Sequence, residues 1–343
     1  MKQHLNTLFV TTQGAYLYKH GEAVAVRIEK KDRLRVPLNN IGSIACFGRV
    51  ACSPPLLGAC GQRGVSVSFL TERGRFLAAV NGFTPGNVLL RRTQYRRADD
   101  PEASAELARA CVIGKLVNLR TVLRRTAREH GQSESARKLT GAANRIDHAV
   151  QLLDRRTSLD VVRGMEGESS ATYFEVFDHL ITAQKEPFKF TKRSRRPPLD
   201  RINAVLSFLY SMLALDARAA CEATGLDAAV GFLHRDRPGR PSLALDLMEE
   251  LRPILADRLA LSLVNRQQIK ASGFRIEPTG AVLMGDTTRR EVLAAYQRRK
   301  QETITHPFLG EKMTLGLVVH IQARLFARHL RGDLDAYPPF VWK

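Results

Sequence analysis

One histidine and a group of acidic residues lie close together between residues 231 and 252. His234 ends an apolar run, a loop rich in Pro, Gly and Arg follows, and a predicted helix then carries Asp246, Glu249 and Glu250. Residues three and four apart on a helix share one face, so Asp246 projects beside both glutamates. Oxygen ligands suit Mg²⁺ and Mn²⁺, and a single imidazole favours Mn²⁺. The stretch therefore predicts a site for a divalent cation.

The same acids also have a purely structural interpretation. Ser242 stands where it can cap the predicted helix, and acids near a helix N-terminus interact favourably with the helix dipole. The charge of the whole chain favours the metal site, because acids gathered beside a histidine in so basic a protein are well placed to hold a cation.

A second candidate acid is Glu166, which Gly164 and Gly167 flank where we expect a long helix to begin. Backbone amides and the positive end of the helix dipole favour an ionised carboxylate at such a position. Glu166, Ser170 and Tyr173 share a helical face, and this mixture of an acid and hydroxyls suits a polar cleft. The structural alternative is that Glu166 is only a cap.

The charge of the chain indicates a polyanionic partner. The formal net charge is +19, the pI is about 10.2, and 53 Lys and Arg stand against 34 Asp and Glu. Nucleic acid or an anionic membrane surface would satisfy this balance. We expect no membrane span, because the sequence has no uninterrupted run of about 18 apolar residues, and no signal peptide, because the N-terminus lacks a long apolar core. The expected location is cytoplasmic.

Two basic segments are candidates for contact with nucleic acid. Arg120, Arg124 and Arg128 recur at helical spacing with few acids between them, which favours phosphate contact over a solvated face. In the loop 185–203, two phenylalanines interleave with basic residues, a mixture that stacks bases while it follows phosphates. An exposed linker is the alternative. The residues of this loop that carry the prediction are Phe188, Phe190, Lys189, Lys192, Arg193, Arg195 and Arg196.

The elements that must position these residues fall into two parts. Short alternating apolar runs separated by turn signals predict strands in residues 1–90, and Ser53 with Pro54 predicts a helix over 53–64. We expect a small β-sandwich-like domain. The strands are expected at 15–18, 23–28, 33–38, 41–47, 65–70 and 75–80.

Residues 91–100 are charged and lack an apolar stripe, so we expect a linker there. Asp100 and Pro101 then start a helix, and helical periodicity continues to the C-terminus. The predicted fold class is α+β, with a larger all-α domain over 101–343 that carries the site. Five cysteines without a Cys-x-x-Cys pair argue against a disulfide framework and a structural zinc site.

Four motifs, in order, resemble those of the CRISPR-associated protein one family, the integrase and endonuclease subunit of spacer acquisition. They are RGMEGESSATYF (163–174), RRPPLDRINAVLSFLYSML (195–213), GFLH (231–234) and LDLMEELRP (245–253). The likeness spans nearly the whole chain, including its β-first layout. The opening LNTLFVTTQGAYL (5–17) is similar to the type I-C branch.

The resemblance implies roles for individual residues. Glu166, His234 and Glu249 match the family's ligands for Mg²⁺ or Mn²⁺, and Asp246 matches a supporting acid. This chain has Glu where the family has Asp at position 249, and Glu250 is adjacent, so which carboxylate binds the ion stays open, as does the number of ions. Positions that line the same site are matched by Asn203, Tyr210 and Arg252.

The resemblance also implies a reaction and partners. The reaction would join the 3'-hydroxyls of spacer DNA to the repeat of a CRISPR array by transesterification. The substrate would be double-stranded DNA with single-stranded ends. The chain would form a homodimer through its β domain and bind CRISPR-associated protein two, with CRISPR-associated protein four as a trimming nuclease.

Two other functions fit the same residues. An architectural nucleic-acid-binding protein would use the acids as helix caps and bury the histidine. A zinc-dependent hydrolase of a small anionic substrate would use His234 with two glutamates.

Overall fold

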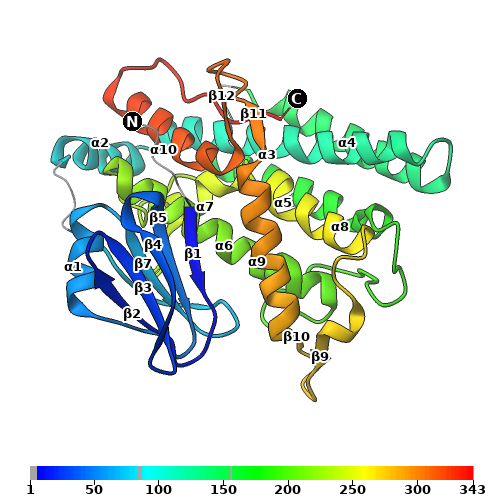
Figure 1. The fold of residues 1–343 in the computed structure, drawn as a ribbon. Helices are drawn as coiled ribbons and strands as arrows, with labels where there is room; N and C mark the ends of the chain where they lie inside the picture. The colour runs from blue at the N-terminus through cyan, green and yellow to red at the C-terminus, as the bar shows by residue number, and fades with distance from the viewer. Residues whose placement is uncertain (1–5, 83–86, 155–156, 343) are drawn as a thin grey trace. The chain divides into compact units, whose positions relative to one another are not determined.

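The computed structural model describes residues 6–82, 87–154 and 157–342 (Figure 1). The chain divides into two compact units, Met1–Asn87 and Val88–Lys343. Each unit has a hydrophobic core of its own.

The first unit contains two four-stranded sheets. In one sheet the order is β1-β5-β7-β8, in which β8 is antiparallel to its neighbour and the other pairs are parallel. In the other the order is β4-β3-β2-β6, with only β2 and β6 paired in parallel. The strands are β1 (Asn6–Val10), β2 (Tyr16–His20), β3 (Ala23–Ile28), β4 (Lys31–Pro37), β5 (Ile41–Phe47), β6 (Ala51–Cys52), β7 (Ser66–Leu70) and β8 (Phe76–Val80).

Side chains from both sheets and from helix α1 (Pro54–Gln62) share one core. Val24 and Leu17 are fully buried in it, as the alternating pattern requires. The Ser53 hydroxyl accepts a hydrogen bond from the Leu56 amide, so the predicted cap of α1 is confirmed. All five cysteines are free, and four of them are buried. The predicted β architecture of the N-terminal region is confirmed, although β1 and the short β6 were not among the expected strands.

The second unit is mainly helical. Its helices are α2 (Val88–Asp99), α3 (Pro101–Glu129), α4 (Glu134–Leu152), α5 (Leu159–Glu175), α6 (Arg201–Thr224), α7 (Ser242–Glu249), α8 (Arg258–Asn265), α9 (Asp286–Gln301) and α10 (Leu315–Arg331). A π-helical turn, η3 (Arg252–Asp257), joins α7 to α8. Two short antiparallel pairs, β9 (Phe274–Ile276) with β10 (Val282–Met284) and β11 (Thr303–Thr305) with β12 (Lys312–Thr314), correct the expectation of an all-α domain.

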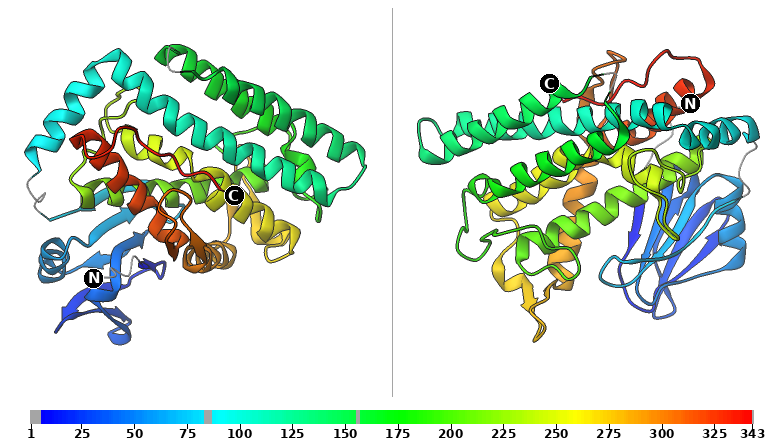
Figure 2. Two further views of the ribbon diagram at one scale, coloured as in Figure 1. Left: turned by 90° about the horizontal axis from the view of Figure 1, so that it is seen from above. Right: turned by 180° about the vertical axis from the view of Figure 1, so that it is seen from behind.

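Helix α6 lies within the core of this unit. It packs against α7 and α10, and α3 and α4 lie side by side (Figure 2). By length and apolar composition α6 is the one helix among the described residues that could cross a membrane, with a mean hydropathy of 1.4. More than half of that window, 56%, is buried inside the unit, which accounts for its composition. Capping of α3 by Asp100 and of α6 by Asp200 is confirmed.

Three local predictions are wrong. Residues 91–100 form most of α2 rather than a linker, because Leu90 and Gln94 are buried and the Gln94 amide donates to the carbonyls of Asp227 and Val230. Two buried residues are too few to give a visible apolar stripe. Helix α5 begins at Leu159, so Glu166 lies in its interior, away from the N-terminal, positive end of the helix dipole. Ser242 does not cap α7, since its hydroxyl donates to the Arg235 carbonyl.

Candidate metal and nucleic-acid site

Helices α3, α5 and α7 bring two of the predicted ligands to one lysine. The Lys115 ammonium contacts Glu166 Oε1 and lies 2.8 Å from Glu249 Oε2. Glu166 Oε1 also accepts a hydrogen bond of 2.9 Å from Ser170 Oγ, one helical turn along α5. The lysine side chain is 7% exposed. Two acids far apart in the sequence therefore share one buried cation.

His234 completes this cluster and is held by Asp246. Oδ1 of Asp246 lies 2.6 Å from His234 Nδ1, and the Asp246 carboxylate also accepts the backbone amides of residues 232–234. An ionised carboxylate accepts, so Nδ1 carries the proton and Nε2 is left to bind a cation. Nε2 lies 3.8 Å from Glu249 Oε1. Asp246 thus fixes the orientation of the imidazole.

Glu249 is held ionised inside the protein. Burial raises the pKa of its carboxyl, but the charges of Arg252 and Lys115, with His234, lower that pKa to about 2. Arg252 Nη1 lies 2.6 Å from Glu249 Oε1. Oε2 is buried and receives no hydrogen bond of regular geometry from any described residue. Glu249 Oε2 fits the role of a metal ligand, because it belongs to an ionised carboxylate and already faces a cation, the Lys115 ammonium.

Glu250 has a different environment, although it adjoins Glu249. Its carboxylate accepts hydrogen bonds from Tyr337 Oη at 2.7 Å, the Phe340 amide at 2.6 Å and Gln322 Nε2 at 3.0 Å. Burial raises the pKa of Glu250 to about 7, although these hydrogen bonds act to lower it. Glu250 therefore joins α7 to the C-terminal segment, whereas Glu249 is the carboxylate that faces the cluster. Which carboxylate binds the ion stays a prediction.

Of the residues expected to line the site, Arg252 pairs with Glu249 and Tyr210 contacts Arg252, whereas Asn203 has its partners in the loop before α6. The Arg252 guanidinium is 5.0 Å from the centre of the Tyr210 ring, whose hydroxyl donates to Asp257 Oδ1 at 2.7 Å. Burial raises the pKa of Tyr210 well above its usual value. Asn203 is buried and binds the loop before α6 instead, through the Lys192 carbonyl and the Arg193 side chain.

The two basic segments are only partly available for nucleic acid. Arg120 and Arg124 both pair with Asp147 of α4, an acid that the spacing along α3 could not reveal. Phe188 and Phe190 are buried, so the expectation that they stack bases is wrong. Arg193 is held by Asn203 and by Ser207. The exposed basic residues of the loop are Lys185, Lys189, Lys192, Arg195 and Arg196.

Lys115 is the site residue that sequence reasoning missed. Its one signal is a single charge in the otherwise uncharged stretch 110–119 of α3. Only the folded chain shows that its partners come from α5 and α7.

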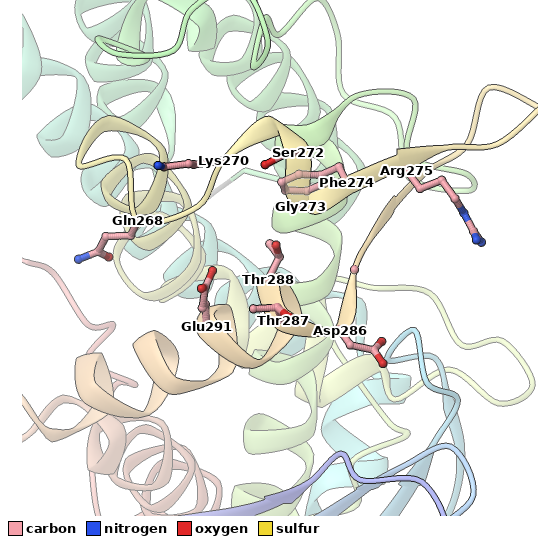
Figure 3. A pocket seen from close by; sticks show the side chains of 11 residues that line it. Gln268, Lys270, Ser272, Gly273, Phe274, Arg275, Asp286, Thr287, Thr288 and Glu291 are labelled. Atoms are coloured by element: carbon pink, nitrogen blue, oxygen red, sulfur yellow. The ribbon is translucent and has the colours of Figure 1, made fainter.

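A separate open pocket of ≈ 520 Å³ lies at the start of α9 (Figure 3). Lys270, Arg275, Asp286 and Glu291 line it, together with small polar residues. Charges of both signs border it, and the predicted ligands are not among its lining residues. The pocket is thus distinct from the cluster around Lys115.

The donor set of the cluster fits a divalent cation. Two carboxylates contact a buried ammonium, and an imidazole nitrogen lies 3.8 Å from one of these carboxylates. Hard oxygen ligands with one imidazole suit Mg²⁺ or Mn²⁺. Within the described ranges no three His, Cys, Asp or Glu side chains stand as a metal-binding group. In this cluster Lys115 lies between Glu166 and Glu249.

The motifs in this cluster match a known family. The sequence model described as CRISPR associated protein Cas1 matches residues 8–298. The chain belongs to the Cas1 family. The resemblance carried by the four motifs is therefore confirmed, while the type I-C subtype stays a prediction.

Individual relatives agree with the assignment to Cas1. The CRISPR-associated endonuclease Cas1 1 of Chlorobaculum tepidum is 54% identical, with 100% of each chain covered. A CRISPR-associated exonuclease Cas4/endonuclease Cas1 fusion of Geobacter sulfurreducens is 34% identical over 97% of this chain and 60% of its own length.

Solved structures share the fold. A casposase bound to integration product has a TM-score of 0.83 at 20% identity, covering 99% of this chain and 95% of its own. A chain of a Cas6-RT-Cas1–Cas2 complex has a TM-score of 0.82 at 22% identity, covering 100% of this chain and 36% of its own. The predicted α+β architecture is thus confirmed.

We expect Asp246→Asn to weaken Mn²⁺ binding by about 10- to 100-fold, the range for residues that orient a metal-binding histidine. An amide in this place has one acceptor oxygen, so it cannot accept from His234 and from the backbone amides of Phe232 and Leu233 at once. Isothermal titration calorimetry measures the change, and Asp333→Asn, at an exposed acid paired with Arg331, is the control. Equal affinities in the two variants would show that Asp246 does not position the histidine.

Proposed function

We propose that this Cas1 protein is a divalent-metal-dependent DNA endonuclease and integrase of CRISPR adaptation, which joins spacer 3'-hydroxyls to the repeat by transesterification. The observation that carries the proposal is the convergence of Glu166 and Glu249 on one buried cationic position, with His234 beside it. The names of the relatives, endonuclease Cas1 and a casposase bound to integration product, support the same reaction class.

In this proposal Glu166, His234 and Glu249 hold Mg²⁺ or Mn²⁺. The chemistry that such an ion supplies is polarisation of the scissile phosphate and stabilisation of charge on the attacking or leaving oxygen. Asp246 accepts the hydrogen bond from His234 Nδ1 and so orients the imidazole with Nε2 available to the ion. Arg252 lies at 2.6 Å from Glu249 and offsets negative charge next to the phosphate. The nucleophile is a DNA hydroxyl or water, so the chain need not supply one.

Affinity for double-stranded DNA with single-stranded ends comes mainly from dispersed basic residues in this proposal. The net charge of +19 supports it, and so does the exposure of Lys192, Arg195 and Arg196. Arg120 and Arg124 contribute to DNA affinity when a DNA phosphate replaces Asp147 as their partner. Arg193 acts indirectly, because it holds the loop in place.

The proposed partners follow from the relatives' names. A complex that contains Cas1 and Cas2 supports binding of Cas2, and a Cas4/Cas1 fusion supports cooperation with Cas4. We also propose a homodimer through the first unit and a cytoplasmic location.

A strand-transfer assay tests the proposal. The parent and His234→Ala are incubated with a linear or branched DNA substrate, with Mn²⁺ or with chelator, and DNA binding is measured over a series of salt concentrations. We expect products only for the parent with Mn²⁺, and similar salt-sensitive binding for both proteins.

Two outcomes would contradict the proposal. Strong DNA binding with no effect of divalent ions on strand transfer would indicate an architectural protein. One tightly bound zinc, with activity on a small anionic molecule and none on DNA, would indicate a hydrolase.

A further inference from the structure

Lys115 is an unusual feature of a metal site, because its side chain is a buried cation among the metal's own ligands. It contacts Glu166 and Glu249, and only 7% of the side chain is exposed. A buried ammonium is costly unless it is paired, and these acids are its pairing partners. In turn, the buried Glu249 carboxylate is paired with Lys115 and Arg252.

The ammonium and a divalent cation cannot occupy this position together. Lys115 Nζ contacts Glu166 Oε1 while it lies 2.8 Å from Glu249 Oε2. An ion bound to both oxygens would lie about 2.0–2.2 Å from each of them, and so in nearly the same place as the ammonium. Binding of the ion therefore requires the lysine side chain to withdraw.

The charges of the cluster are consistent with such an exchange. Three carboxylates (Glu166, Asp246, Glu249) and one guanidinium (Arg252) give −3 + 1 = −2 with a neutral histidine. A divalent cation balances this charge fully. Lys115 balances half of it, which lowers the repulsion between Glu166 and Glu249 when the ion is absent.

We propose that Lys115 is an internal counter-ion that occupies the metal position in the ion-free protein and leaves it when Mg²⁺ or Mn²⁺ binds. This inference rests on the proposed function of the same site. Lys115 keeps the ion-free site assembled and, because it must be displaced, weakens the apparent affinity for the ion. Lys115 is thus a positioning residue that adjusts metal affinity.

Replacement by methionine, of similar length and without charge, tests the inference. Lys115→Met is expected to lower the Tm of the chelator-treated protein and to tighten Mn²⁺ binding by at least about tenfold, the lower end of effects seen for groups around metal ligands. Calorimetric titration gives the Kd, and thermal denaturation gives the Tm. The control is Lys138→Met, since Lys138 forms an exposed pair with Glu134 on α4. An unchanged or weaker Mn²⁺ affinity in Lys115→Met would overturn the inference.

A second measurement uses the unaltered protein, so it does not depend on how the variant folds. Brief acetylation followed by mass spectrometry compares Lys115 with Lys138, with Mn²⁺ or with chelator. We expect Mn²⁺ to accelerate labelling of Lys115 several-fold and to leave Lys138 unchanged.

The two proposals can fail separately. If the parent binds Mn²⁺ while Lys115 stays unreactive, the counter-ion inference alone is wrong. If the parent binds no Mn²⁺, the proposed metal-dependent function fails as well.

Discussion

Glu249→Gln is expected to abolish DNA cleavage and strand transfer, whereas Glu250→Gln keeps both close to the parental rate. The two residues are adjacent and chemically identical, so they form a matched pair. Only Glu249 faces Lys115, Arg252 and His234. Mutation of a residue that hydrogen-bonds to a metal ligand reduces activity by up to about 100-fold. Loss of a ligand itself should therefore reduce strand transfer by more than about 100-fold.

Glu250→Gln should instead affect stability. The carboxylate accepts from Tyr337, Phe340 and Gln322, and an amide in its place puts an NH₂ group against donors. We expect a loss of about 1–3 kcal/mol in the free energy of unfolding. Strand-transfer rates with Mn²⁺ and urea denaturation separate the two effects. Equal loss of activity in both variants, at temperatures where both are folded, would mean that Glu249 has no special role.

Asn118→Ala is expected to destabilise the protein by at least about 3 kcal/mol, because it leaves several buried polar groups without partners. Asn118 Nδ2 donates to the carbonyls of Glu250 at 2.7 Å and Phe340 at 2.8 Å, and Oδ1 accepts from the Trp342 amide at 2.7 Å. The side chain is fully buried.

Urea denaturation measures this loss, with Asn144→Ala as the control, since Asn144 is exposed on α4. A change no larger than that of the control would show that the bonds of Asn118 are dispensable.

Much of the fold could be predicted from local signals. Apolar alternation located β2 to β5, β7 and β8, and the caps Ser53, Asp100 and Asp200 marked helix starts. These features depend on residues within a few positions of each other, so the sequence alone displays them. Helix α2 was missed because only Leu90 and Gln94 of its residues are buried.

The candidate site could be predicted only where a motif carried it. His234 and Asp246 lie in two neighbouring motifs, 12 positions apart, and the structure brings them together. Lys115 and Asp147 act through contacts between different helices, and no spacing in the sequence encodes such a contact. The burial of Phe188 and Phe190 likewise depends on side chains elsewhere, such as Phe274 and Phe174.

Hydrogen bonds attach residues 337–342 to Asn118 and Glu250. These bonds affect any experiment that uses truncation to find the surfaces that other molecules recognise. A truncation before Tyr337 removes two donors from Glu250 and every tail partner of Asn118, next to the acid that faces Lys115. Shortened forms that lack residues 337–342 are therefore expected to be destabilised around α7, so a loss of activity in them would not by itself locate a recognition surface.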